Sequence, residues 1–244
     1  MIRRREFITL LGAAAAWPVA ARAQQAALPV VGYLGAVSTD TAGMIRRGLS
    51  EAGYVGGRNV VFEDRLADGR YHRLATLAAD LVRRQVTVLI TSGSPAALAA
   101  KAATTTIPIV FGFGDDPVKY GLVTSLNRPG GNVTGITFLT SQLDSKRVGL
   151  LREIVPQATG GIAVLLNHTN TNAESQSTEV KQAARALGLQ LHIVNASSED
   201  EFDSAFAAIA QTGASALLVA GDPFYFSRRK IGGIGGAAQY SDDV

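Results

Sequence analysis

Two adjacent carboxylates, Asp115 and Asp116, follow the apolar run IPIVFGF at residues 107–113 and precede Pro117. Side chains of this kind are poor core material, because burying an unpaired charge is costly. They could hold an ammonium group, a metal ion or a proton, or they could only form a turn. Metal binding and nucleophilic catalysis have little other support, since the chain contains no cysteine and its three histidines are far apart. We therefore expect no metal, no cofactor and no enzymatic activity.

A pair of serines could form a site for an anion, in contrast to the carboxylates, which would attract a cation. Ser92 and Ser94 stand in the segment SGSP, directly before a helical run that has Pro95 in its first turn. The N-terminus of such a helix presents free backbone N–H groups and a favourable dipole to an anion. A carboxylate bound by the serines and an ammonium group bound by an aspartate would together suit an amino acid. The sequence therefore favours an amino acid as a ligand.

The same residues also have a purely structural explanation. Serine, aspartate and proline are common at helix starts, so SGSP and GDDP can be caps. Asp115 and Asp116 are not expected to act as a catalytic pair, because neighbouring residues usually point in different directions. The chain contains no dinucleotide fingerprint, phosphate-binding loop, nucleophile elbow or zinc-protease motif. The ligand and cap explanations both stay open for each loop.

The elements that must carry these residues alternate between strands and helices. Short apolar runs predict strands at 28–34, 58–65, 86–91, 107–113 and 131–138, and segments with helical periodicity lie between them. After a helix at 142–155 the same rhythm resumes, with strands at 160–166, 189–195 and 214–221. Strict alternation of this kind predicts an α/β fold with parallel sheets that carry helices on both faces.

Ligands of open parallel sheets bind beyond the carboxyl ends of the strands. The loops at these ends are short and polar in both halves of the chain. They supply the candidate ligand-binding residues Ser38, Ser92, Ser94, Asp115, Asp116, Thr137, Asn167 and Asp222. The aromatic residues that could surround a ring are Tyr33, Phe113, Phe138, Phe224 and Tyr225, and most of them could equally belong to the core.

The first 23 residues have the composition of an export signal. A basic start is followed by an apolar stretch from Phe7 to Ala16, and Ala21-Arg22-Ala23 matches a cleavage site. The apolar stretch is too short to span a bilayer, which takes about 20 apolar residues. Arg4-Arg5 predicts the twin-arginine route, with the general secretory route as the alternative. The rest of the chain carries 19 basic and 19 acidic residues, so its charge does not favour nucleic-acid binding.

Several segments resemble the ABC-transporter substrate-binding proteins of the tryptophan/tyrosine type. The most specific is DPVKYGLVTSLNRPGGNVTGIT at residues 116–137, and others are GLSEAGYVGGRNVVFEDRLADG and GDPFYFSRR. The resemblance runs from the leader to about Arg229. It implies two doubly wound parallel-sheet lobes of the type I periplasmic binding protein kind, with a small ligand held in the cleft between them.

The resemblance also implies a biological setting. Proteins of this type work in the bacterial periplasm and deliver a small molecule to an ABC permease in the inner membrane. We expect a monomer that binds a small ligand, binds no nucleic acid and keeps no membrane anchor once the leader is removed. The alternatives are an enzyme on the same fold and the ligand-sensing core of a transcription regulator. The export signal disfavours the regulator, because it occupies the place of a DNA-binding helix-turn-helix.

The resemblance and the element pattern together predict four segments. Residues 1–23 are the leader, 24–140 the first α/β lobe, 141–229 a second α/β lobe and 230–244 a flexible or aberrant tail. The tail is rich in glycine and alanine and has no apolar period. Because members of this family normally continue with further strands and helices, we expect the chain to be truncated or frameshifted after about Arg229. We expect its second lobe to be incomplete.

Overall fold

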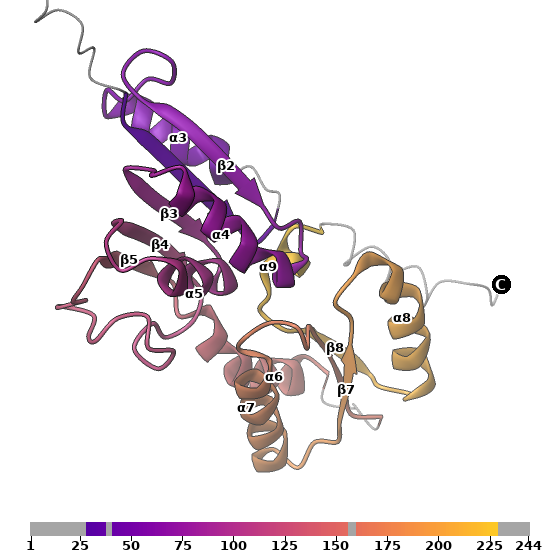
Figure 1. Ribbon diagram of the computed structural model, residues 1–244. Helices are drawn as coiled ribbons and strands as arrows, with labels where there is room; N and C mark the ends of the chain where they lie inside the picture. Colours follow the sequence, from indigo (N-terminus) through magenta and orange to yellow (C-terminus); the bar gives the residue numbers. More distant parts are fainter. Residues whose placement is uncertain (1–27, 38–40, 156–159, 229–244) are drawn as a thin grey trace, which may run out of the picture.

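The computed structural model describes residues 28–37, 41–155 and 160–228. Strands and helices alternate along the chain, and the strands of each sheet pair in parallel. The first sheet has five strands in the order β2-β1-β3-β4-β5, and the second has three in the order β7-β6-β8. Figure 1 shows the two sheets as separate lobes with their own helices. The predicted α/β fold with two parallel-sheet lobes is confirmed.

The first lobe is built from the short apolar runs near the start of the chain. Its strands are β1 (Val30–Gly35), β2 (Val61–Leu66), β3 (Val88–Ser92), β4 (Ile109–Phe113) and β5 (Val133–Thr137). Its helices are α3 (Thr41–Glu51), α4 (Leu74–Arg83) and α5 (Ser94–Ala103), and a 3-10 turn at Tyr71–Arg73 precedes α4. Helix α4 buries Leu74, Ala78 and Leu81, which share one face because they are spaced three or four residues apart.

The second lobe repeats this arrangement on a smaller scale. Its strands are β6 (Ile162–Leu166), β7 (Leu191–Asn195) and β8 (Ala216–Val219). Its helices are α6 (Asp144–Ile154), α7 (Ala173–Ala186) and α8 (Phe202–Gln211), with 3-10 turns at Thr140–Leu143 and Glu199–Glu201. Every residue of β6 is buried, which explains why its sequence IAVLL is apolar without interruption.

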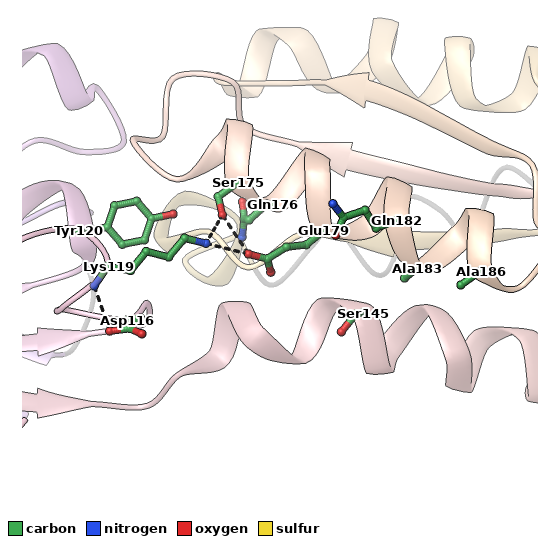
Figure 2. A pocket seen from close by; sticks show the side chains of 10 residues that line it. All are labelled: Asp116, Lys119, Tyr120, Ser145, Ser175, Gln176, Glu179, Gln182, Ala183 and Ala186. Atoms are coloured by element: carbon green, nitrogen blue, oxygen red, sulfur yellow. Dashed lines mark hydrogen bonds and ion pairs between the residues drawn. The ribbon is translucent and has the colours of Figure 1, made fainter.

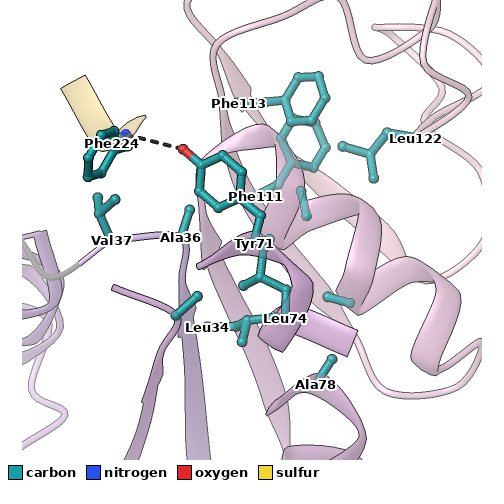
Figure 3. Close-up of a cluster of buried hydrophobic side chains, with 14 of the residues drawn as sticks. Leu34, Ala36, Val37, Tyr71, Leu74, Ala78, Phe111, Phe113, Leu122 and Phe224 are labelled. Atoms are coloured by element: carbon teal, nitrogen blue, oxygen red, sulfur yellow. Dashed lines mark hydrogen bonds between the residues drawn. The ribbon is translucent and has the colours of Figure 1, made fainter. Parts of the chain in front are cut away.

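The short helix α9 (Pro223–Phe226) connects the two lobes through the apolar core. Phe224 and Tyr225 pack against Phe202 of α8, and the Phe202 and Phe224 ring centroids lie 5.5 Å apart. The same buried cluster includes Ala36 and Tyr71 of the first lobe. Figure 3 shows the Tyr71 hydroxyl reaching the backbone nitrogen of Phe224. One buried apolar cluster therefore spans both lobes, and a second lies within the second lobe.

The second strand begins later than the sequence predicts. Residues 58 and 59, expected to lie in it, belong to a turn that the side chain of Asn59 holds in place. The Asn59 side chain accepts a hydrogen bond from the backbone N–H of Val55 (2.7 Å) and donates one to the carbonyl oxygen of Gly53 (2.8 Å). Local bonds of this kind compete with a sheet ladder, so the strand starts only at Val61.

Some expectations concern parts of the chain outside the described residues. These are the leader at 1–23, its cleavage site and the tail at 230–244. The lobe boundary expected at residue 140 stays a prediction. Within the described ranges, none of the helices is long and apolar enough to cross a membrane.

Candidate functional site

A cavity of about 530 Å³ lies where the loops of the two sheets meet. In the first lobe its walls come from strands β3, β4 and β5 and the segments that follow them. In the second lobe they come from the segments after β6 and β8. Its buried polar lining consists of Thr91, Ser94, Asp115, Asn170, Asn172 and Asp222. The carboxyl ends of parallel strands thus converge on one cavity, as expected for such sheets.

Asp115 is the carboxylate that connects the two lobes inside this cavity. It is 2% exposed, and its Oδ2 accepts a hydrogen bond from the hydroxyl of Ser94, the first residue of α5. Its Oδ1 accepts a hydrogen bond of 2.7 Å from Nδ2 of Asn172, the residue before α7. Its backbone oxygen accepts one of 2.6 Å from the Thr137 hydroxyl at the end of β5. Three elements therefore fix the position of this carboxylate.

The neighbouring carboxylate, Asp116, has a structural role in a turn. Its Oδ1 accepts hydrogen bonds from the backbone N–H groups of Val118 (2.9 Å) and Lys119 (3.2 Å). Asp116 therefore stabilises the turn that follows β4, which is the cap explanation considered for this loop. Asp115 and Asp116 have separate partners, in agreement with the expectation that two neighbouring residues point in different directions.

Asp222 is buried at the N-terminus of α9 and is saturated by donors. Its Oδ1 accepts from the Tyr71 hydroxyl (3.0 Å), Asn167 Nδ2 (3.3 Å) and the Phe224 backbone N–H (2.8 Å). Its Oδ2 accepts from Asn170 Nδ2 (2.5 Å). Burial raises the pKa of the Asp222 carboxyl, and the hydrogen bonds oppose that rise. A carboxylate offers about four lone-pair sites, so these four donors leave Asp115 better placed to accept a further one.

The other predicted site residues lie at or behind the cavity wall. Ser92 and Ser94 line the cavity. Thr137 and Asn167 do not line it, but they donate hydrogen bonds to Asp115 and Asp222, which do. Ser38 lies outside the described residues. Between the two serines, Gly93 has a φ of +91°, and a Cβ there would lie 3.0 Å from the ring of Pro223. Glycine at this position lets α9 approach the start of α5 closely.

Three buried polar residues of the lining were not among the sequence candidates: Thr91, Asn170 and Asn172. Thr91 Oγ1 and Asn172 Oδ1 are buried and have no hydrogen-bond partner within the described part of the chain. Asn170 and Asn172 could have been considered, because they stand in the polar loop between β6 and α7. Nothing in the sequence separates them from Asn167, which shares that loop.

Most of the remaining lining is apolar. Of the predicted aromatic residues, Phe113 and Phe138 line the cavity, whereas Tyr33, Phe224 and Tyr225 are buried without lining it. Phe226, which the sequence did not suggest, also lines the cavity; further apolar wall comes from Ile45, Ile90, Val110 and Ile136. The lining residues that the structure describes include no lysine, arginine or histidine. The charged groups of the cavity are thus the carboxyl groups of Asp115 and Asp222.

A second cavity, of about 550 Å³, lies between the loop after β4 and helices α6 and α7. Figure 2 shows Lys119 of that loop reaching Ser175 and Glu179 on α7. Lys119 Nζ lies 2.5 Å from Ser175 Oγ and 3.0 Å from Glu179 Oε1, and the hydrogen bond to Glu179 raises the pKa of Lys119. Lys119, Ser175 and Glu179 bind one another, so this cavity marks a contact between the lobes.

Comparisons with known proteins agree with this geometry. A family model described as ABC transporter substrate binding protein matches residues 35–230. A protein named Tyrosine-binding protein from Clostridioides difficile is 28% identical over 163 residues, which are 67% of this chain and 46% of the relative. The chain therefore spans about half the length of this curated relative.

Two solved structures have the same fold. A conserved domain protein from Vibrio cholerae has a TM-score of 0.68 and 31% identity, with 78% of this chain and 64% of that chain covered. An ABC domain from Streptococcus pneumonia, solved in complex with L-Trp, has a TM-score of 0.68 and 25% identity, with coverages of 82% and 68%. The chain belongs to the family of ABC transporter substrate-binding proteins.

Proposed function

We propose that this protein is the extracytoplasmic solute-binding component of an ABC importer and that it captures an amino acid between its two lobes. The observation that carries the proposal is the position of Asp115. Its carboxylate belongs to the first lobe, accepts a hydrogen bond from Asn172 of the second lobe and lines the cavity between them. A ligand held at this point contacts both lobes and can stabilise one relative position of the lobes. A membrane partner can then distinguish the ligand-bound protein from the free protein.

The chemistry of the cavity suits a small molecule with a polar and an apolar end. Asp115 can accept hydrogen bonds from an ammonium group. Ser92, the last residue of β3, and the backbone N–H groups at the start of α5 can bind a carboxylate with help from the helix dipole, while the Ser94 hydroxyl donates to Asp115. The apolar wall can hold the side chain of the ligand. The names of the Tyrosine-binding protein and of the complex with L-Trp support an amino acid as ligand class.

The proposed setting follows from the leader and the family. An export signal with a twin-arginine pair would place the mature chain, from residue 24, outside the cytoplasm. Its partner would be a permease in the inner membrane, which accepts the ligand from a monomeric binding protein. The balanced charge of the chain after the leader supports a small ligand over nucleic acid.

A thermal-shift screen of the chain from residue 24 tests the proposal. A bound ligand raises the apparent stability by RT ln(1 + [L]/Kd), so the melting temperature should rise with ligand concentration. We expect a concentration-dependent rise with at least one L-amino acid, and calorimetric titration should confirm one site. If none of the L-amino acids raises the melting temperature of the folded chain, the proposed ligand class is wrong.

A further inference from the structure

We propose that Asn172 is a specificity-determining residue, whose Oδ1 accepts a hydrogen bond from an N–H donor of the ligand. It would select amine-bearing ligands over analogues of the same shape without the amine. This inference rests on the proposed function, because it assigns a group of the same cavity to recognition. Asn172 lies directly before α7 and is 3% exposed.

The orientation of the Asn172 amide follows from its partner. Nδ2 lies 2.7 Å from Oδ1 of Asp115, and an ionised carboxylate can only accept hydrogen bonds. The NH₂ group must therefore face Asp115, and the amide cannot be turned the other way without placing two acceptors together. This leaves Oδ1 as the free end of the side chain, available only to a donor.

That free acceptor has no donor within the described ranges. Asn172 Oδ1 is buried and unpaired, although buried polar groups in folded proteins are almost always hydrogen-bonded. The residue belongs to the lining of the cavity, beside Asp115. A hydrogen bond from the ligand to Asn172 Oδ1 would satisfy this buried acceptor and so favour binding.

The charges of the cavity indicate which donor fits. The described lining contains two carboxyl groups and no cationic side chain, so a positively charged donor is favoured over a neutral one. An ammonium group placed against Asp115 and Asn172 would pair with a carboxylate oxygen and an amide oxygen together. An analogue that lacks the amine would leave both acceptors unpaired, and sites built on hydrogen bonds reject such analogues strongly.

Matched ligand pairs test this role. The probes are L-tyrosine with hydroxyphenylpropionate and L-leucine with isocaproate, where the second member of each pair lacks only the amine. Calorimetric titration of the wild-type chain should give a lower Kd for at least one amine than for its partner, by about tenfold or more. In Asn172→Ala this preference should fall by about tenfold, mostly through weaker binding of the amine.

The controls separate recognition from folding. Asn195→Ala removes an exposed asparagine at the end of β7 and should leave the preference unchanged. If Asn172→Ala does not fold, Asn172→Ser is measured instead and should also lose preference. Equal losses for both members of a pair, or an unchanged preference, would overturn the role of Asn172. A wild-type chain that binds amine and analogue equally would overturn it as well, while leaving the proposed function intact. A wild-type chain that binds none of the four probes would count against both.

Discussion

The hydroxyl of Tyr71 donates a hydrogen bond of 3.0 Å to Oδ1 of Asp222, and the same hydroxyl accepts one of 3.2 Å from the backbone N–H of Phe224. Tyr71 belongs to the first lobe, whereas Asp222 and Phe224 stand at the start of α9 after the last strand of the second. Burial raises the pKa of Tyr71, so its hydroxyl keeps its proton and remains a donor. This relationship fixes α9 against the first lobe.

Replacing Tyr71 by phenylalanine should therefore destabilise the protein. Tyr71→Phe keeps the ring in the core but leaves Asp222 without one donor and Phe224 without one acceptor. Loss of a partner for buried groups of this kind costs about 1–3 kcal/mol. Urea denaturation followed by circular dichroism measures the change. Tyr54→Phe, at an exposed tyrosine, is the control and should change little. Equal stabilities for Tyr71→Phe and wild type would contradict this prediction.

Asp115 and Asp116 should respond differently to substitution. Asp115→Ala removes the proposed ammonium partner, and a hydrogen bond to a charged group is worth about 1.5–3 kcal/mol, so Kd should rise roughly tenfold to a hundredfold. Asp116→Ala removes only bonds within a turn and should leave Kd unchanged, with a stability loss of about 1 kcal/mol. Calorimetry with an amino acid that the wild-type chain binds measures both variants. Normal binding by Asp115→Ala would show that its carboxylate is only structural.

Asp80 should make stability depend on acid pH. Hydrogen bonds from Arg83, Arg65 and Arg84 lower the pKa of the Asp80 carboxyl from 3.8 to about 2. Because the folded-state pKa is depressed, this stabilisation is fully present above the unfolded-state value and is lost as pH falls through the folded-state value. Asp80→Asn should be less stable than wild type at neutral pH, and the difference should vanish near pH 2. A pH-independent difference in unfolding free energy would contradict the linkage.

The contact between Lys119 and Glu179 should contribute a small and salt-sensitive coupling. Both side chains are partly exposed, and exposed ion pairs contribute about 0.2–1 kcal/mol. A double-mutant cycle with Lys119→Met and Glu179→Gln, measured by urea denaturation, should give a coupling in that range at low salt. The coupling should shrink at high salt, because screening weakens exposed pairs. A coupling of zero at low salt would mean that the contact does not hold the lobes together.

Much of the fold could be predicted because its signals are local. The strands coincide with short apolar runs, and α4 coincides with a periodic apolar face. Ser94 and Asp115 could be placed near one another because parallel strands end at the same edge of a sheet. This much follows from local pattern and topology together.

Other features could not be predicted, because they depend on contacts between distant segments. The sequence did not indicate that Asp222 is saturated by donors from Tyr71 and two asparagines. It also could not separate Asn172 from Asn167, since both are polar residues in one loop. Only packing of the second lobe against the first brings Asn172 to Asp115 and leaves the Asn172 oxygen unpaired.

The apolar core shared by the lobes has a consequence for the order of events during synthesis. The chain emerges from the ribosome from its N-terminus, so Tyr71 is available long before Phe224, from which it is separated by 153 positions. Until α9 appears, part of the apolar surface around Ala36 and Tyr71 has no cover. Contacts of such long sequence separation form late and slow folding. A nascent chain halted before residue 223 should therefore remain bound by chaperones. Chaperone release and compaction of the chain should coincide with the emergence of α9 from the ribosome.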